Sequence, residues 1–257
     1  MEADYARRFS GLDRLWGAGS SQRLANAHVA VVGLGGVGSW CAEALARSGV
    51  GALTLIDFDQ VAESNINRQV HALTQTLGQA KIDAMRDRIL GINPGCHVHL
   101  IEDFLTPDNI DNTWPEQAQV VVDACDQGAA KLAMAFRSLR QGLPLVMVGA
   151  AGGKSQPQAV RVGDLSQVTH DPLLARLRRA LRRELACTPQ QALGIACVYS
   201  QEAVRASQLC EADAMSAHDL NCHGYGSFVG VTATFGLVAA SCAIEHLIRG
   251  KSAINKL

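Results

Sequence analysis

The chain has 257 residues, with 23 Lys and Arg against 24 Asp and Glu, and 48% of its residues are apolar. This length corresponds to one large α/β domain, or to one domain with an appendage. Apolar content is normal and the charged fraction of 18% is low, which excludes wholesale disorder. A net charge of −1 predicts no global attraction to nucleic acid or anionic membranes, although a local patch could still bind either.

The chain starts with Met-Glu-Ala-Asp and has no basic region followed by an apolar one, so we expect no secretory signal and a cytoplasmic protein. In that compartment its eight cysteines are more consistent with free thiols than with a disulfide framework. They form no C-x-x-C pair, and we therefore expect no structural zinc site.

In the first half, short β-rich runs alternate with helical stretches, which is typical of a parallel sheet with helices on both faces. The runs are almost continuously apolar, as in strands buried on both sides. We therefore predict an α/β fold with a doubly wound, Rossmann-like, mainly parallel sheet. The predicted strands are His28–Val32, Ala52–Ile56, Val98–Ile101, Val120–Val122 and Leu145–Val148, and the predicted helices are Val37–Arg47, Gln79–Leu90 and Ala129–Arg140.

The second half is looser, with short strands expected at Ala159–Val162 and Ile195–Tyr199. Between them, Asp171–Leu185 predicts an amphipathic helix with a stripe of leucines. Its opposite face carries five arginines within eight residues, namely Arg176, Arg178, Arg179, Arg182 and Arg183. Taken alone, such a face is more simply a solvated helix surface than a binding site.

No formally charged residue occurs from Asn221 to Ile244, a run long enough to span a bilayer. The run is rich in Gly, Ala, Ser and Thr, so its hydrophobicity is modest. We expect a core or dimer-interface helix, with membrane association as the minor alternative.

A glycine motif, Gly33-Leu-Gly35-Gly36-Val-Gly38, follows the first predicted strand and precedes a helix, as the phosphate-binding fingerprint requires. Gly33 allows a tight turn, Gly35 lets phosphate oxygens approach the backbone, and Gly38 lets the helix pack closely on the strand. Free amide N–H groups and the positive end of the helix dipole then attract an anion.

Asp57 ends the second predicted strand, where an acidic residue usually holds a ribose. On its own this would suggest a dinucleotide dehydrogenase. Arg68 and Lys81 indicate a different ligand, because two cations beside a phosphate loop fit a triphosphate better than a nicotinamide. After the fourth predicted strand, Asp123-Ala-Cys-Asp126 supplies carboxylates where a magnesium ion bridging phosphates would lie.

Together these motifs resemble those of the ThiF/MoeB/E1 family of ATP-dependent adenylating enzymes, which turn a carboxylate into an acyl-adenylate and release pyrophosphate. The resemblance runs from Gly33 to Asp126 in the family's order and spacing. It implies ATP and Mg²⁺ as ligands, with Arg68, Lys81 and Asp126 in catalysis and Asp126 as the metal ligand. The residues it implies for nucleotide binding are Gly33, Gly35, Gly36, Gly38, Asp57, Asp59, Asn65 and Gln69.

The opening Arg8-Phe-Ser10 resembles the family's N-terminal motif, from which an arginine reaches across a dimer to the partner's ATP. Gly11 stands where the family has its second arginine, and Arg14 follows three residues later. The resemblance therefore implies a homodimer with Arg14 as the crossing catalytic residue, and Arg7 and Arg8 remain alternatives.

The second half is similar to the branch of this family that acts on threonylcarbamoyladenosine in tRNA, through Gly152-Gly-Lys154, Asp171–Arg176 and Val198–Glu202. That branch implies an ATP-dependent dehydration that cyclises the threonylcarbamoyl group of adenosine 37, after adenylation of its carboxylate. It also implies that tRNA contacts the five arginines of the predicted amphipathic helix.

The alternative activity is adenylation of a ubiquitin-like or sulfur-carrier protein for sulfur transfer, with a sulfur acceptor or cysteine desulfurase as partner. The missing C-x-x-C pairs disfavour it, and it would be favoured by an essential cysteine in the second half, where Cys187, Cys197, Cys210 and Cys222 lie. A nucleotide-binding module without catalysis is a third hypothesis, which the intact set of Arg68, Lys81 and Asp126 disfavours.

We expect residues 1–257 to form a single E1-like adenylating domain. Residues 1–27 would be an N-terminal helical arm, residues 28–150 the nucleotide-binding core, and residues 151–257 a part for substrate and dimer contacts with the arginine-rich helix and a closing apolar helix.

Overall fold

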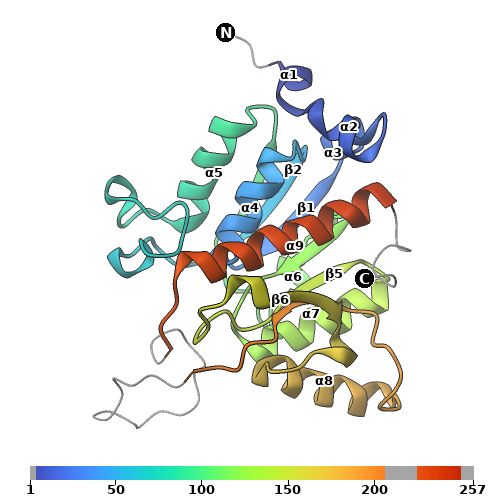
Figure 1. Ribbon diagram of the computed structural model, residues 1–257. Coiled ribbons are helices and arrows are strands. Elements are labelled where there is room, and N and C mark those ends of the chain that lie inside the picture. The colour runs from blue at the N-terminus through green and yellow to red at the C-terminus, as the bar shows by residue number, and fades with distance from the viewer. Residues whose placement is uncertain (1–3, 206–224, 250–257) are drawn as a thin grey trace.

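The computed structural model describes residues 4–205 and 225–249, and its centre is a seven-stranded sheet in the order β3-β2-β1-β4-β5-β7-β6 (Figure 1). All neighbouring strands are parallel except β6 and β7, which pair antiparallel. The predicted doubly wound, mainly parallel sheet is thereby confirmed. The strands are β1 His28–Val32, β2 Ala52–Ile56, β3 His97–Ile101, β4 Val120–Asp123, β5 Leu145–Val148, β6 Val160–Asp164 and β7 Ala196–Ser200.

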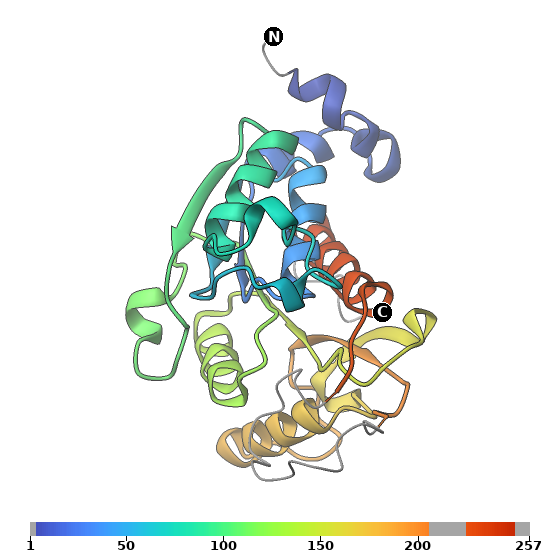
Figure 2. The ribbon, with the colours of Figure 1, turned by 90° about the vertical axis from the view of Figure 1, so that its left-hand side faces the viewer.

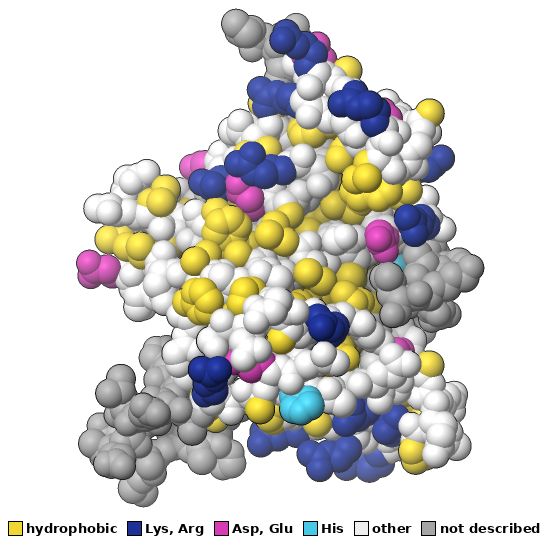
Figure 3. Space-filling view, in the orientation of Figure 1, with side chains coloured by type: hydrophobic (Ala, Val, Ile, Leu, Met, Phe, Trp, Pro, Cys, Tyr) yellow, Lys and Arg dark blue, Asp and Glu magenta, His cyan; other side chains and the backbone are white. Residues whose placement is uncertain are grey.

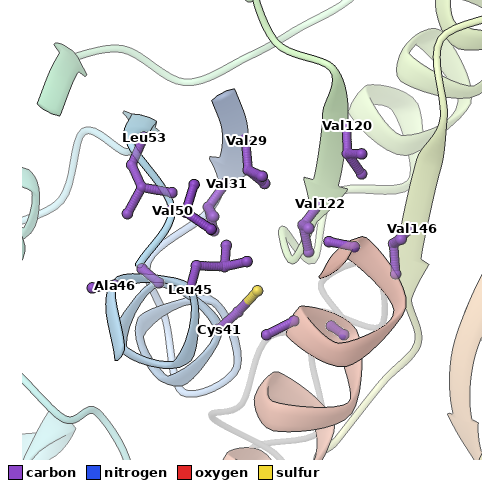
Figure 4. Packing of buried hydrophobic residues seen from close by; sticks show 14 of the residues in the cluster. Val29, Val31, Cys41, Leu45, Ala46, Val50, Leu53, Val120, Val122 and Val146 are labelled. Carbon is purple, nitrogen blue, oxygen red and sulfur yellow. The ribbon is translucent and has the colours of Figure 1, made fainter. Parts of the chain in front are cut away.

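Successive residues of the central strands face opposite sides of the sheet, and each side has its own core. On one side, Val29, Val31 and Val122 pack toward helices α4 (Gly38–Arg47) and α9 (Val229–Arg249), as Figure 4 shows, and α5 (Lys81–Ile92) completes this layer. On the other side, the cluster that includes Ala30, Val32 and Val121 is covered by α6 (Ile110–Thr113), α7 (Gly128–Gln141) and α8 (Pro172–Leu185).

Three short helices form the N-terminal arm: α1 (Tyr5–Phe9), α2 (Gly11–Trp16) and α3 (Ser20–Ala25). Figures 1 and 2 agree in placing this arm at one end of the molecule and α8 at the opposite end. The arm is attached through Tyr5, whose hydroxyl donates to the carbonyl oxygens of Ser21 and Gly49.

Helix α9 has the length and composition of a membrane span, with a mean hydropathy of 1.6, but half of its most apolar window is buried within the protein. Its glycine Gly236 lies so close to α4 that a Cβ atom there would come within 2.4 Å of the Val37 carbonyl oxygen. A core helix that packs on α4 and the sheet explains the absence of charge from Val229 to Ile244, and residues 221–224 of the predicted segment lie outside the described residues.

The arginine-rich segment is a helix, as predicted, and begins one residue later, at Pro172. Asp171 is its N-cap: its side chain accepts a hydrogen bond from the Leu174 amide. The predicted leucine stripe is buried against α7 and the sheet, with Leu173, Leu174, Leu177 and Leu181 all in the core.

Candidate functional site

A pocket of about 500 Å³ opens at the carboxyl ends of β1, β2, β4 and β5, a volume in the usual range for small-molecule sites. In open α/β sheets, ligands bind at this edge, where the strand order reverses, here between β1 and β4. Ten of the residues expected from the sequence line it: Gly33, Gly35, Gly36, Asp57, Asp59, Asn65, Arg68, Gln69, Lys81 and Asp126. Of the remaining two, Gly38 lies behind the turn, and Arg14 lies outside the pocket in the N-terminal arm.

Glycine is present at Gly33, Gly35 and Gly38 for three different structural reasons. Gly33 has φ +86°, in the left-handed region that favours glycine. At Gly38 a Cβ atom would come within 1.7 Å of the Gly33 carbonyl oxygen, so only glycine allows the helix to start there. At Gly35 a Cβ atom would meet nothing within 4 Å, because it would extend into open space. The turn therefore exposes backbone to a ligand at Gly35.

Asp57 connects the end of β2 to the glycine turn. Its Oδ2 accepts from the Leu34 amide at 2.5 Å and its Oδ1 accepts from the Asp59 amide at 2.9 Å. Burial raises the pKa of Asp57, whereas Lys81 and the two amide N–H groups oppose that rise. Each carboxylate oxygen has lone-pair capacity left for a hydroxyl donor such as a ribose would bring.

Lys81 is the first residue of α5, and its side chain is buried. Its Nζ lies 2.6 Å from Asp59 Oδ2, and its amide donates to the Asp59 carbonyl oxygen at 3.0 Å. The ammonium is therefore held in one place on the pocket wall. Asp59 is half exposed, so the ion pair is partly screened by solvent.

Arg68 lies across the glycine turn: a Cβ atom on Gly36 would come within 3.1 Å of its Cγ. The Trp40 indole N–H donates to the Arg68 carbonyl oxygen at 3.0 Å and fixes the backbone. One terminal nitrogen donates to the Ser64 carbonyl oxygen and to Asn67 Oδ1. The guanidinium has five N–H donors, so most of them stay available to an anion over the turn.

Asn65 and Gln69 are both buried beside Arg68. The Asn65 side chain accepts a hydrogen bond from the Ala62 amide at 3.1 Å and so closes the short turn that carries Arg68. Gln69 Oε1 is buried and has no hydrogen-bond partner among the described residues. Gln69 lines the pocket, and the Asn65 oxygen is already used by the turn.

Asp126 lies in the turn between β4 and α7, where it lines the pocket with an exposed side chain. The described part of the chain has no cluster of three or more His, Cys, Asp or Glu that could hold a metal ion unaided. One carboxylate beside a phosphate site still fits Mg²⁺, which is commonly bound by one or two carboxylates together with substrate phosphates.

The comparison with known proteins agrees with this geometry. A ThiF-family model matches residues 5–253. The chain belongs to the ThiF family. The chain is 42% identical over 253 residues to the tRNA threonylcarbamoyladenosine dehydratase of Escherichia coli K12, covering 95% of this chain and 94% of the relative. It is 39% identical to the Haemophilus influenzae protein of the same name, covering 97% and 96%.

Solved structures of the same E. coli enzyme match this chain closely. The E. coli tRNA N6-threonylcarbamoyladenosine dehydratase TcdA in complex with ATP matches with a TM-score of 0.85 at 41% identity, covering 97% of each chain. The complex of that enzyme with AMP matches with a TM-score of 0.86 at 42% identity. The predicted family and fold are thus confirmed, and the activity expected from the sequence is the one that these relatives' names state.

In this ThiF-family chain, one wall of the pocket consists of residues that the sequence did not place at the nucleotide site. It consists of Gly149–Gly152 after β5 and of Pro172 and Leu173 at the start of α8. Asp171 joins the two, because its Oδ2 accepts from the Ala150 amide at 2.8 Å. In the sequence, Gly152-Gly-Lys154 and Asp171–Arg176 indicated only the likeness to the tRNA-modifying branch, not a place in the nucleotide pocket. Lys154 itself is buried and donates to the carbonyl oxygens of His170 and Glu202, and it does not line the pocket.

The five arginines of α8 divide into two stripes. Arg178 and Arg182 are half-buried, and their guanidinium groups donate to the carbonyl oxygens of Val168 and Pro189. Arg176, Arg179 and Arg183 are exposed, and Figure 3 shows Lys and Arg side chains gathered at the end of the molecule where α8 lies. Because α8 starts at the pocket wall, this charged surface begins beside the site.

The cysteines show no reactive arrangement in the described ranges. Cys197 is fully buried in β7, and burial raises the pKa of its thiol well above the ordinary value. Cys125 lines the pocket, and burial and the Asp123 carboxylate likewise raise the pKa of its thiol. Cys187 is half-buried just after α8. Cys210 and Cys222 lie outside the described residues.

Proposed function

We propose that this chain is an ATP-dependent tRNA threonylcarbamoyladenosine dehydratase. The observation that carries the proposal is one pocket that brings together a glycine turn, two cations, a free carboxylate and the start of an arginine-rich helix. The proposal is further supported by relatives of the same name that match nearly the whole chain.

The proposed reaction has two steps. First, the carboxylate of the threonylcarbamoyl group attacks the α-phosphorus of ATP; an acyl O–P bond forms, the α–β phosphoanhydride bond breaks, and pyrophosphate leaves. Second, an atom of the same side chain attacks the activated acyl carbon, AMP leaves with the former carboxylate oxygen, and the attacking atom gives up its proton to water. The side chain has then lost one water. Both steps need positioning and charge stabilisation, and neither needs a protein nucleophile.

Different pocket residues would bind the phosphates, the ribose and the metal ion in this reaction. The amides around Gly35 and the start of α4 would hold phosphate oxygens, and Asp57 would accept from the ribose. Arg68 and Lys81, whose side chains are held by hydrogen bonds and an ion pair, would stabilise negative charge that develops as pyrophosphate leaves. Asp126 would hold Mg²⁺, which would supply positive charge to neutralise the phosphates.

The exposed stripe of α8 would bind the tRNA backbone. Arg176, Arg179 and Arg183 are spaced by three and four residues, so they lie on one side of the helix over about 10 Å, given a rise of about 1.5 Å per residue. Such a row can contact successive phosphates and supplies the local charge that a nearly neutral chain needs for a tRNA partner. A tRNA substrate also supports a cytoplasmic location.

A homodimer is part of the same proposal. Arg14 is exposed on α2 and lies outside its own chain's pocket, as expected of a residue that completes a partner's ATP site. Leu15 of the arm and Leu237 of α9 are 70% and 49% exposed. Figure 3 shows hydrophobic side chains gathered across the middle of one face of the molecule. A second copy covering this face would remove them from water.

The decisive experiment incubates the protein with ATP, Mg²⁺ and tRNA that carries threonylcarbamoyladenosine, and then weighs the released nucleoside. The proposal expects a product lighter by one water, with AMP and pyrophosphate formed in equal amounts. An unchanged nucleoside mass from protein that binds ATP would refute it. A parallel reaction with a carrier protein ending in Gly-Gly tests the sulfur-transfer alternative, which an adenylated carrier would support.

A further inference from the structure

A lysine–aspartate ion pair lies completely buried behind the pocket and does not line it. Asp123 is the last residue of β4 and Lys131 lies in the first turn of α7. Both side chains are 0% exposed, and Nζ and Oδ1 are 3.0 Å apart. Because taking two charges out of water is costly, such a pair is often no more stabilising than apolar residues of the same size. Its presence here points to a role besides stability.

All three N–H donors of the Lys131 ammonium have partners. Besides the Asp123 carboxylate, Nζ donates to the Val148 carbonyl oxygen at 2.8 Å and to the Asp123 carbonyl oxygen at 3.4 Å. Burial alone would lower the pKa of Lys131, but the Asp123 carboxylate raises it above its ordinary value, so the ammonium stays charged. Asp123 and Val148 end the adjacent strands β4 and β5, and Lys131 ties both ends to α7.

On the β4 side, the ion pair fixes the turn that leads to Asp126. Asp123 Oδ1, the oxygen that contacts Lys131, also accepts from the Cys125 amide at 3.2 Å and from its thiol at 3.1 Å. Asp126 is the next residue; its own side chain is exposed and forms no ion pair among the described residues. This turn therefore sets the backbone position from which the Asp126 carboxylate extends.

On the β5 side, the Val148 carbonyl precedes the glycine turn Gly149–Gly152 that forms the opposite pocket wall. The Ala150 amide in that turn donates to Asp171, which also caps α8. A Cβ atom on Gly149 would come within 2.1 Å of Asp171 Oδ2, so the contact between turn and cap is close. Lys131 thus connects to the β4 side of the pocket through Asp123. It connects to the β5 side and the start of α8 through Val148 and the backbone that follows it.

We propose that Lys131 is a positioning residue, which sets the turn carrying Asp126 against the glycine turn Gly149–Gly152 through its bonds to Asp123 and Val148. The inference rests on the proposed function for its substrate, but its effect on magnesium-dependent ATP binding does not need tRNA. Groups that support a metal ligand typically change metal affinity about 10- to 100-fold when they are removed.

The test compares two variants. Lys131→Met leaves Asp123 buried and unpaired, so it is expected to lose stability whatever else it does. Asp123→Asn combined with Lys131→Met removes both charges and keeps the side-chain sizes, so it is expected to recover most of the lost Tm. If Lys131 positions the site, the double variant still needs about 10- to 100-fold more Mg²⁺ for half-maximal ATP binding. Its kcat is also lower, with little change in KM for tRNA.

Glu43→Gln is the matched control, because Glu43 is a nearly buried carboxylate paired with Arg47 and Arg88 and does not line the pocket. It should lower Tm without changing the Mg²⁺ requirement. Calorimetric ATP titrations at several Mg²⁺ concentrations, well below the Tm of every variant, give the readout.

A double variant with the wild-type Mg²⁺ requirement and kcat would overturn the inference, and so would wild-type ATP binding that does not depend on Mg²⁺. If the wild type binds ATP with Mg²⁺ but dehydrates no tRNA, the proposed function fails while the titrations still decide the role of Lys131.

Discussion

Gly38 packs against Gly33 so closely that a Cβ atom at Gly38 would come within 1.7 Å of the Gly33 carbonyl oxygen. Gly38→Ala is therefore expected to force the start of α4 away from β1. We expect a loss of about 3 kcal/mol in the free energy of unfolding, as for a severely overpacked site. At this chain length that corresponds to about 6 to 12 °C in Tm, which thermal unfolding followed by circular dichroism would measure.

Gly35→Ala is the matched change at the same turn, because its Cβ atom would extend into open pocket space. We expect an unchanged Tm and at least about tenfold weaker ATP binding in calorimetry, equivalent to about 1.4 kcal/mol, because the methyl group occupies space that phosphate oxygens need. Equal ATP affinity in wild type and Gly35→Ala would mean that the phosphates do not lie against this turn.

The two stripes of α8 predict different effects on tRNA binding. Replacing Arg176, Arg179 and Arg183 together by Ala should weaken tRNA binding and reduce the slope of log K against log salt by about 2 to 3, because about three phosphate contacts are lost. ATP affinity and Tm should stay unchanged, since these side chains lie outside the pocket and make no backbone contact in the described structure.

Arg178→Ala with Arg182→Ala is the control for this experiment. These guanidinium groups donate to backbone carbonyl oxygens, so their loss should lower Tm while most of the salt dependence remains. Filter binding of tRNA across a salt series separates the outcomes. An unchanged slope in the triple variant would exclude the exposed stripe as the tRNA surface.

Sequence patterns were sufficient for the parts of the fold that depend on local chemistry. Continuous apolar runs gave the strands, and the leucine stripe Leu173–Leu181 gave the buried face of α8. The glycine spacing and the charges that follow it predicted one pocket edge, because the carboxyl ends of parallel strands meet there. The resemblance to the ThiF/MoeB/E1 family then implied ATP as the ligand, which the pattern of apolar and charged residues alone does not identify.

The remaining features depend on contacts between segments far apart in the sequence. Asp171 contacts Ala150 because α8 starts beside the end of β5, and no local pattern indicates that pairing. Lys131 looks like one more helical lysine in the sequence, yet it is fully buried and bonded to Val148. Likewise, the five arginines look alike until the carbonyl groups around Arg178 and Arg182 are placed.

The Lys81 ammonium is fixed on the pocket wall by the Asp59 carboxylate. We expect Lys81→Met to lower kcat by about 100- to 1,000-fold, as when one preorganised donor to a developing charge is removed. Tm should change little, because the Asp59 carboxylate is half exposed and stays solvated without its partner.

Asp59→Asn removes the partner and keeps the cation, so steady-state kinetics should show a much smaller loss of kcat for this variant. Equal losses in Lys81→Met and Asp59→Asn would instead mean that the ion pair as a whole, and not the charge of Lys81, is required.

His71 predicts how stability depends on pH. It is buried next to the site, neither ring nitrogen has a hydrogen-bond partner among the described residues, and burial, followed by Lys81 and Arg88, lowers its pKa to about 4. Between that value and the ordinary pKa of about 6.5, the unfolded chain binds a proton that the folded chain does not. His71 therefore contributes stability that is fully present above about pH 6.5 and is lost as the pH falls toward 4, by up to about 3 kcal/mol.

His71→Leu should remove this contribution, because an apolar side chain of similar size cannot take up the proton. Urea unfolding at about pH 7.5 and at about pH 4.5 measures it as the difference between wild type and variant. We expect the wild type to lose more stability than His71→Leu between the two pH values. Equal losses of stability in wild type and His71→Leu would show that His71 takes up its proton equally well in the folded and the unfolded chain. Such a group contributes no pH dependence to stability.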